Sequence, residues 1–388
     1  MVLAIFFNAY IMLFFFMSLK PDELYMAMAL KLAGKGRGMT SPNPMVGAVL
    51  VKGGRIIAQG FHEKAGSPHA EAMALEQAGK KAQGASLFVS LEPCCHLKKR
   101  TPPCTAAIIR SGVKEVIAAM EDPNPAVCGK GLEEIKKAGI TVRSGVLEKK
   151  ARLLNEAYIK YITERTPFVT LKAAMSLDGK IATAGGESKW ITGPEARRMV
   201  HQLRAATDAI ITAVGTVLAD DPELTVRLAS SRKKPGGQAG SDKNPVRVVI
   251  DPELVSPLTS KIFRTPPRTI VVTRKKPLPP VLALAGVESI NYEGKLSLKW
   301  LLGKLAAMGM ISVLIEGGSS LNAHAFDEDV VDKAVFFYAP KIFGGVKSIP
   351  AVGGHGVLKL DEAWRLRDIS IKRAGEDFFV TGYIEHRS

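Results

Sequence analysis

The amino-acid sequence predicts an α/β protein with two domains, and three observations support this prediction. The chain has 388 residues, which is long for one domain and sufficient for two. Between about residues 22 and 145, strand-like and helix-like segments alternate, as is typical of a sheet covered by helices. A new strand pattern begins after Pro167. We therefore expect an apolar leader at 1–16 and domains at 17–165 and 166–388.

Each element of the first domain follows from a local signal. A helix should begin near Pro21, because proline is favoured in the first turn of a helix. The stretch "MVGAVLVKGGRIIAQGF" (45–61) predicts a β-hairpin, since two apolar runs flank a Gly-Gly turn. Gly112 is expected to end a short helix. The other predicted elements are helices at 69–82, 105–112 and 130–139, strands at 85–93, 113–120 and 140–145, and a helical stretch at 148–165.

The second domain continues the alternation. The segment "IEGGSSLNAHAF" (315–326) predicts a strand, a glycine turn and a helix start, whose backbone N–H groups can bind phosphate. The full G-x-G-x-x-G fingerprint is absent, so an ordinary dinucleotide-binding fold is not supported, and a structural turn is the other interpretation. The other predicted elements are strands at 168–182, 208–214, 246–251 and 268–273, helices at 193–207 and 296–308, a loop at 215–227, and a mobile Gly/Ser/Lys-rich stretch at 229–244.

Charge and hydropathy limit the possible partners. The net charge is +16 at pH 7, but the basic residues are scattered and only 6% of residues are aromatic. A solvated basic surface or a small anionic substrate therefore explains the charge better than nucleic-acid binding does. The first 17 residues are uncharged and apolar, but they are short for a membrane span of about 20 residues. They also lack the features of a secretory signal, so a non-essential extension is favoured over a membrane anchor.

A catalytic metal site is predicted from His69, Cys94 and Cys104. Catalytic zinc takes about three ligands of this type and leaves one position for water, whose pKa it lowers toward about 7. Glu71 is then the candidate general acid and base. Residues i and i+2 lie on different faces within a helix, so His69 and Glu71 can converge only at a helix mouth, and Pro68 marks such a start.

The spacing of the cysteines needs an unusual form of the zinc-deaminase signature H-x-E … P-C-x-x-C, because nine residues separate Cys94 from Cys104. The stretches "SPNPMVGAV", "HEKAGSPHAE", "LEPC", "RTPPC" and "MEDPNP" resemble the deaminase half of the bifunctional riboflavin biosynthesis deaminase–reductase family. That family has serine at the place of Cys95 and one residue fewer in the loop. Cys94 is the expected ligand because it follows Pro93, and Cys95 is interpreted as a stand-in for the serine.

Other residues in or near these stretches have two interpretations. The resemblance implies that Asn43, His62 and His96 line a pyrimidine pocket, but each fits a turn or packing role equally well. Cys128 matches no family motif and is predicted to be a small buried residue.

Further along the chain, "KAAMSLDGKIAT", "GESKWITG", "GTVLADDPELTVR" and "EGG" resemble the reductase half of the same family, whose fold is like that of dihydrofolate reductase. Lys172 is a candidate for polarising or protonating the sugar. Asp178 has two equally good interpretations, a role in the reaction and a structural role in holding the turn that follows it. Without the resemblance, Arg204 could equally be a surface residue, although an arginine suits a phosphate. The resemblance implies NADPH contacts at Ala174, Trp190, Thr216, Asp220, Gly318, Ser319, Ser320, Leu321, Asn322, Ala323 and His324, and substrate contacts at Ser188, Arg204, Leu224, Arg227 and Glu316.

The sequence thus predicts a cytidine-deaminase-like α/β/α domain followed by a dihydrofolate-reductase-like α/β domain. The resemblance implies zinc-dependent deamination of a phosphorylated pyrimidine and then NADPH-dependent reduction of its ribosyl group. It further implies a cytoplasmic homo-oligomer, without a nucleic-acid or membrane partner. A nucleic-acid or nucleoside deaminase with an accessory second domain is the first alternative, and a metal-stabilised binding protein without activity is the second.

Overall fold

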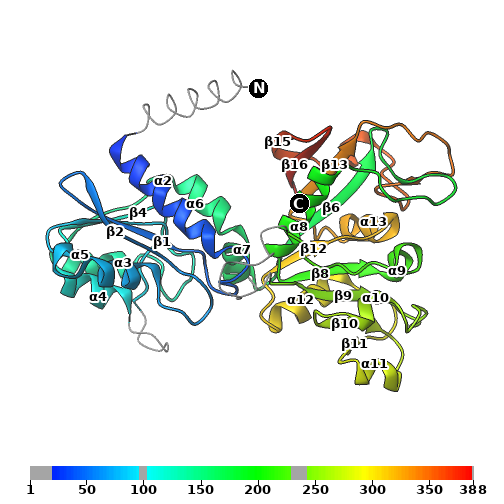
Figure 1. The fold of residues 1–388 in the computed structure, drawn as a ribbon, viewed down its shortest axis with the longest axis horizontal. Coiled ribbons are helices and arrows are strands. Elements are labelled where there is room, and N and C mark those ends of the chain that lie inside the picture. Colours follow the sequence, from blue (N-terminus) through cyan, green and yellow to red (C-terminus); the bar gives the residue numbers. More distant parts are fainter. Residues whose placement is uncertain (1–19, 96–102, 229–242, 387–388) are drawn as a thin grey trace. The chain divides into compact units, whose positions relative to one another are not determined.

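The computed structural model describes residues 20–95, 103–228 and 243–386 (Figure 1). The predicted leader at 1–16, His96 and most of the predicted mobile stretch lie outside these residues. The chain divides into two compact units, Met1–Glu164 and Arg165–Ser388.

The first unit is built on a five-stranded sheet with the order β2-β1-β3-β4-β5. The predicted hairpin is confirmed, and Gly53 and Gly54 form its turn with φ angles of 56° and 73°, which glycine adopts easily. Strand β1 also pairs antiparallel with β3, and β3, β4 and β5 are parallel. The helices and strands are α2 (Pro21–Ala33), β1 (Gly47–Lys52), β2 (Arg55–Phe61), α3 (Ala70–Ala78), β3 (Ser86–Val89), α4 (Cys104–Ser111), β4 (Glu115–Ala118), α5 (Lys130–Lys137), β5 (Thr141–Arg143), α6 (Glu148–Leu154) and α7 (Glu156–Glu164).

Helices cover both faces of this sheet, because neighbouring residues of a strand point to opposite faces. Ala48 and Leu50 of β1 pack into a core with α3, α4 and α5. On the other face, Gly47 lies directly against α2, where a Cβ atom would come within 2.1 Å of the carbonyl oxygen of Ala29. The unit is therefore an α/β/α sandwich, as Figure 1 shows.

The predicted helical stretch at 148–165 is confirmed, and it consists of two helices. Helix α6 ends at Leu154, Asn155 has φ −107° and ψ 23°, and α7 begins at Glu156. The side chain of Asn155 is 2% exposed and hydrogen-bonds to a distant segment, which explains why the chain turns here.

The second unit contains a nine-stranded sheet with the order β11-β10-β9-β8-β12-β6-β13-β16-β15. The pairs from β11 to β13 are parallel, and β16 and β15 add an antiparallel hairpin at one edge. The strands are β6 (Phe168–Ser176), β7 (Lys180–Ala182), β8 (Ala209–Ala213), β9 (Val246–Ile250), β10 (Thr269–Thr273), β11 (Glu288–Asn291), β12 (Ser312–Ile315), β13 (Lys333–Ala339), β14 (Ile349–Pro350), β15 (Leu366–Ala374) and β16 (Asp377–Ile384). The helices are α8 (Pro194–Ala205), α9 (Val214–Asp220), α10 (Lys261–Arg264), α11 (Pro280–Leu284), α12 (Leu298–Ala307) and α13 (Ser319–Asp327).

Both faces of this sheet are also covered. Ala209 and Ile211 of β8 belong to the core beneath α12 and α13, whereas Ile210 between them packs toward α9, α10 and α11. This burial on two faces explains why the predicted strands read as continuous apolar runs rather than as alternating ones.

Two elements differ from the sequence prediction. The predicted loop at 215–227 begins with α9, and the predicted strand at 168–182 is broken by a turn between β6 and β7. Asp178 accounts for that turn, since its carboxylate accepts hydrogen bonds from the Ser176 hydroxyl and from the backbone N–H groups of Phe343 and Gly344. These bonds lower the pKa of Asp178 to about 2. Among the described residues, no helix is both long enough and apolar enough to cross a membrane.

Candidate active sites

His69 lies at the mouth of α3, as the sequence predicts. It is the N-cap residue of that helix, with an extended backbone (ψ 158°), and Pro68 precedes it. Glu71 follows in the first turn and is 3% exposed. Because His69 stands just outside the helix, it can face the same point as Glu71 although the two residues are only two positions apart.

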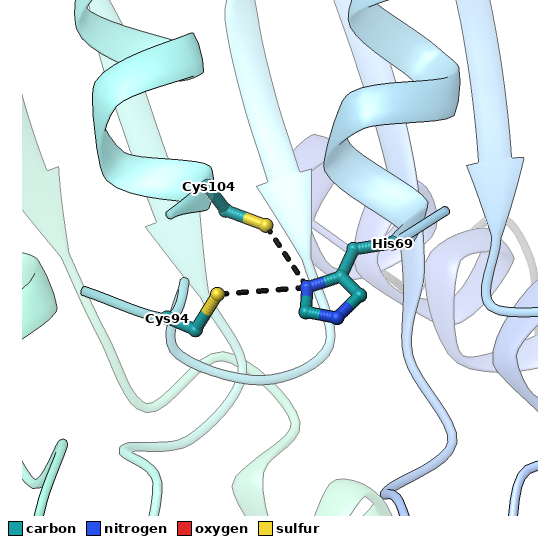
Figure 2. Close-up of side chains that lie close together, drawn as sticks. All are labelled: His69, Cys94 and Cys104. Atoms are coloured by element: carbon teal, nitrogen blue, oxygen red, sulfur yellow. Dashed lines mark hydrogen bonds between the residues drawn. The ribbon is translucent and has the colours of Figure 1, made fainter. Parts of the chain in front are cut away.

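The two cysteines come from neighbouring elements of the same sheet edge. Cys94 lies in the loop after β3, and Cys104 is the first residue of α4. Figure 2 shows both sulfur atoms pointing at the ring of His69. The Nδ1 atom of His69 is 3.2 Å from Sγ of Cys104 and 3.5 Å from Sγ of Cys94. All three ligand atoms lie within 4.8 Å of one another, so residues separated by up to 35 positions form one cluster.

These side chains fit a zinc ion. Tetrahedral zinc with Zn–S bonds of about 2.3 Å and Zn–N bonds of about 2.0 Å places nitrogen and sulfur ligands roughly 3.5 Å apart. The observed distances of 3.2 and 3.5 Å are close to this separation. Among the described residues, this is the only group of three or more such side chains close enough to hold a metal. Three ligands leave a fourth position open, which is typical of catalytic rather than structural zinc.

The electrostatics of the cluster suit acid–base chemistry. Burial raises the pKa of Glu71 to about 6, against a usual value of 4.5, so this carboxyl can gain or lose a proton near neutral pH. A hydrogen bond from the Cys104 thiol, aided by His69, lowers the pKa of Cys94 to about 4. Cys94 is therefore readily held as a thiolate, the form that binds metal.

The other two cysteines lie outside the cluster. Cys95 is not within it, and burial raises the pKa of its thiol. The prediction that Cys128 is buried is wrong, because Cys128 is exposed in the turn before α5. The backbone turns at the next residue, Gly129, whose φ is 78°. The position of Cys128 is therefore set by this turn and not by the usual preference of cysteine for the interior.

Asn43 and His62 lie next to the cluster. The Nδ2 atom of Asn43 is 3.4 Å from Nε2 of His62, and Nδ1 of His62 is 3.1 Å from the carbonyl oxygen of Pro68. The rings of His62 and His69 meet edge to face, with centroids 5.5 Å apart. Both residues thus form a wall beside His69, an arrangement that fits a pocket role and a packing role alike.

The second unit contains a large cavity of about 690 Å³ beside the carboxyl ends of β6, β8 and β12. Ligands of parallel α/β sheets bind at this end of the strands. The predicted site residues that line the cavity are Lys172, Ala174, Ser188, Trp190, Arg204, Thr216, Asp220, Leu224, Arg227, Glu316 and Gly318.

A buried group of three charges forms the floor of this cavity. Arg204 donates to both carboxylate oxygens of Glu316, at 2.7 and 2.9 Å, and Nζ of Lys172 lies 3.6 Å from the same carboxylate. Burial alone would raise the pKa of Glu316, but the charges of Arg204 and Lys172 lower it to about 2. Burial lowers the pKa of Lys172. Arg204 also donates to the carbonyl of Thr225, so each of its three guanidinium nitrogens makes a hydrogen bond within the protein.

The remaining predicted contacts lie around the cavity mouth. Ser188 donates to the carboxylate of Asp220 at 2.8 Å, and Trp190 is 64% exposed. Leu224 is buried and has a φ of 50°, a conformation that costs energy for a branched side chain and is frequent at functional sites. Arg227 pairs with Glu223 at 2.9 Å near the surface.

Of the contacts predicted at the start of α13 and within it, only Gly318 lines the large cavity. Gly318 is the N-cap of α13 and lines the cavity, without a side-chain hydrogen bond to the first turn, so backbone N–H groups there are available to a phosphate. Asn322 is fully buried and donates to the carbonyl of Ala351 at 2.7 Å, while His324 pairs with Glu328. The predicted residues of α13 that do not line the large cavity are Ser319, Ser320, Leu321, Asn322, Ala323 and His324.

Several residues that line the cavity were not predicted from the sequence. Arg197 and His201 line it from α8, and Arg197 stacks on the ring of Trp190 at 4.8 Å. They precede Arg204 by seven and three positions, so all three share one helix face, and this periodicity in "RRMVHQLR" was a usable signal. Lys189 and Lys261 also line the cavity, but nothing in their local sequence distinguishes them from surface lysines.

The comparisons with known proteins agree with this geometry. Residues 19–120 match the model of the cytidine and deoxycytidylate deaminase zinc-binding region, and residues 167–380 match the RibD C-terminal domain. The riboflavin biosynthesis protein RibD of Aquifex aeolicus is 46% identical over 361 residues, which cover 92% of this chain and 97% of that protein. The protein of the same name from Escherichia coli is 40% identical over 92% of this chain and 97% of its own length.

Solved structures give the same result. RibD of Acinetobacter baumannii has a TM-score of 0.84 and 38% identity, and the match covers 94% of this chain and 99% of that one. A diaminohydroxyphosphoribosylaminopyrimidine deaminase/5-amino-6-(5-phosphoribosylamino)uracil reductase from Thermotoga maritima has a TM-score of 0.83 and 39% identity, with the same coverage.

A zinc-binding deaminase unit joined to a reductase unit defines a bifunctional deaminase–reductase. The chain belongs to the RibD family of riboflavin biosynthesis proteins. The predicted fold class and both activities are thereby confirmed, as are the two cofactors, zinc and NADPH. The alternatives of a nucleic-acid deaminase with an accessory domain and of an inactive binding protein are set aside, because the match to RibD extends over both units.

Proposed function

We propose that the first unit deaminates 2,5-diamino-6-(5-phosphoribosylamino)pyrimidin-4-one, with His69, Cys94 and Cys104 as zinc ligands and Glu71 as the proton carrier. The observation that carries this proposal is the convergence of one imidazole and two sulfur atoms beside a buried carboxyl group. The substrate is supported by the name of the similar Thermotoga maritima protein, which specifies this deaminase and reductase pair.

The chemistry of the first step needs one water and one proton carrier. Water adds to the ring carbon that bears the amino group, the C–N bond breaks, and a carbonyl group and ammonia result. When bound, zinc supplies the Lewis acidity that makes water nucleophilic at neutral pH. Glu71 accepts the proton that the water oxygen loses and returns it to the departing nitrogen. A buried carboxyl with a pKa of about 6 suits both halves of this transfer.

We propose that the cavity of the second unit then reduces the ribosyl group to ribityl. NADPH supplies the hydride, and the protein binds and orients the reactants. Lys172 holds a proton at Nζ on the cavity floor, where its side chain is 15% exposed, and Glu316 keeps this amine in place. The first turn of α13 is the proposed pyrophosphate site, and Arg227 at the mouth is the proposed contact to the substrate phosphate.

The domain and cellular assignments follow the same resemblance. We propose residues 17–165 as the deaminase domain and residues 166–388 as the reductase domain. The enzyme is proposed to act in the cytoplasm as a homo-oligomer, with a small phosphorylated pyrimidine as its partner. Sedimentation of the purified full chain would test the homo-oligomer, since a monomer at micromolar concentration would contradict it.

A two-readout assay tests the site assignment. Ammonia release is followed on the diaminopyrimidine ribosylamine phosphate, and NADPH oxidation is followed on substrate that has already been deaminated. Glu71→Gln should lower ammonia release by about 10²- to 10⁴-fold, the usual contribution of a general acid–base residue. NADPH oxidation should be unchanged. The matched control is Glu76→Gln, an exposed carboxyl on the same helix, which should affect neither rate. Equal loss of both activities in Glu71→Gln would contradict two independent sites.

A further inference from the structure

We infer that Asn155, between α6 and α7, is a positioning residue of the deaminase pocket, because its side chain holds the backbone of Met45 and thereby the wall formed by Asn43 and His62. The inference depends on the proposed metal site at His69. Asn155 lies beyond the residues that match the zinc-binding region, 19–120. The helical arm α6–α7 is thus part of the catalytic architecture, and not only a connection to the second unit.

The contact between Asn155 and Met45 joins residues 110 positions apart. The Met45 N–H donates to Oδ1 of Asn155 at 2.8 Å, and Nδ2 of Asn155 donates to the Met45 carbonyl at 3.0 Å. The side-chain amide of Asn155 thus pairs with both the N–H and the carbonyl of Met45, as the backbone of a neighbouring strand would. Met45 lies two residues before β1, which begins at Gly47. The Asn155 side chain therefore fixes the backbone of the loop that leads into this strand.

Met45 is linked to the metal site by a short series of contacts. Val46, the next residue, accepts a hydrogen bond from the His62 N–H at 2.9 Å. The Pro68 carbonyl can only accept, so Nδ1 of His62 donates to it, and Nε2 on the other side of the ring lies 3.4 Å from the amide nitrogen of Asn43. His62 then meets the ring of His69 edge to face. Asn155 thus fixes the backbone on both sides of Met45, which carries Asn43 and also Val46, the acceptor for the His62 N–H.

A second side chain of the same arm supports this role. Tyr158, three residues after Asn155, is buried and donates its hydroxyl to Asp122 at 2.9 Å. The Asp122 N–H in turn donates to Glu92, which lies two positions before Cys94. The α6–α7 arm therefore reaches the surroundings of the metal site at two places, through buried polar contacts rather than through apolar packing alone.

An Asn155 variant should affect the pocket wall without affecting the metal ligands. The proposed zinc ligands are held by α3, α4 and the loop after β3, none of which touches Asn155 in these hydrogen bonds. Loss of the Met45 contacts should therefore displace the pocket wall and leave the metal bound. A displaced pocket wall weakens binding of the ground state and the transition state alike, and such a loss appears mainly in KM. We therefore expect the substrate KM of deamination to rise by roughly 10-fold, with a smaller change in kcat.

The experiment compares Asn155→Leu, Asn155→Asp and a control, Thr163→Val, in the full zinc-loaded enzyme. Asn155→Asp has the same shape and keeps the acceptor for the Met45 N–H, but its carboxylate cannot donate to the Met45 carbonyl. Thr163 is exposed on α7, and its hydroxyl bonds only within that helix. The readouts are KM and kcat for ammonia release, zinc content, and NADPH oxidation on pre-deaminated substrate.

The expected result is a raised deamination KM in Asn155→Leu, a smaller rise in Asn155→Asp, and normal values in Thr163→Val. Zinc content and NADPH oxidation should stay at wild-type levels in all three. A wild-type KM in both Asn155 variants would overturn the inference, as would loss of zinc in Asn155→Asp. If Asn155→Leu does not fold, the isosteric Asn155→Asp decides. Failure of the proposed site itself would appear separately, as ammonia release that survives Glu71→Gln.

Discussion

Glu316 sits at the end of β12, and its replacement by glutamine would leave two buried cations without a counter-charge. The side chain of Glu316 is 7% exposed, and those of Arg204 and Lys172 are 12% and 15% exposed. Glutamine keeps the size of the side chain and removes only the charge. The variant therefore measures how much the carboxylate stabilises the folded second unit.

Two routes give the same magnitude. The pKa of Glu316 falls from 4.5 to about 2 on folding. At 1.36 kcal/mol for each pKa unit, this corresponds to about 3 kcal/mol of stability at neutral pH. Removing one member of a buried ion pair costs about 3–5 kcal/mol in other proteins. For a domain of this size, a loss of about 3 kcal/mol lowers the melting temperature by roughly 6–12 °C.

The pH dependence has a definite sign. A carboxyl whose pKa is lowered by folding contributes its full stabilisation above its unfolded pKa of 4.5, and loses it as the pH falls toward the folded value of about 2. The difference in stability between wild type and Glu316→Gln should therefore be constant from pH 7 to about pH 5 and should shrink below pH 4.5. Calorimetric unfolding at several pH values measures this difference.

The chain offers a matched control in Glu288, which binds Arg268 with the same two-pronged geometry, at 2.5 and 2.7 Å, but at the surface. The two side chains are 48% and 41% exposed, so Glu288→Gln should cost less than about 1 kcal/mol. Equal losses of stability in the two variants would contradict this prediction, because burial would then contribute nothing. Glu316→Gln should also lower NADPH oxidation and leave ammonia release intact.

The remaining predictions concern the metal site and the reductase floor. Cys94→Ser should abolish stoichiometric zinc binding in a competition titration with a chromophoric chelator, whereas Cys95→Ser should keep it, and the opposite pattern would assign the ligand to Cys95. Treatment of wild type with a strong chelator should stop ammonia release and spare NADPH oxidation of pre-deaminated substrate; loss of both rates would place the metal in both activities. Lys172→Met should lower the rate of NADPH oxidation by about 10²-fold or more without changing ammonia release, and a normal rate would remove Lys172 from the reduction step.

Local patterns predicted much of the fold and the whole candidate metal cluster. The Gly53–Gly54 turn, the start of α2 at Pro21 and the end of α4 at Gly112 were predicted from turn and cap preferences, which act over a few residues. His69, Cys94 and Cys104 were recognisable because few side chains bind zinc and their spacing fits a helix mouth and a strand end. The reductase contacts were expected only through resemblance, since their residue types are common.

Other features were not predictable, for a physical reason in each case. The division of 148–165 at Asn155 follows from a contact with Met45, and nothing in the helical pattern itself indicates it. Cys128 was expected inside by residue preference, but the turn that carries it is at the surface. Helix α9 lies in a segment whose Asp-Asp-Pro composition is typical of a loop.

Short segments of the sequence were enough to predict most of the alternation of strands and helices in the first domain, the ligand types for zinc and the presence of an acid–base carboxyl, because periodicity, caps and side-chain chemistry are local properties. The folded structure was needed to show that Arg204 binds Glu316, 112 residues away, and that Asn155 binds Met45, 110 residues away. Such pairings depend on which elements become neighbours in the folded sheets. Which elements become neighbours depends on the packing of the whole domain, and this packing cannot be inferred from any single segment of the sequence.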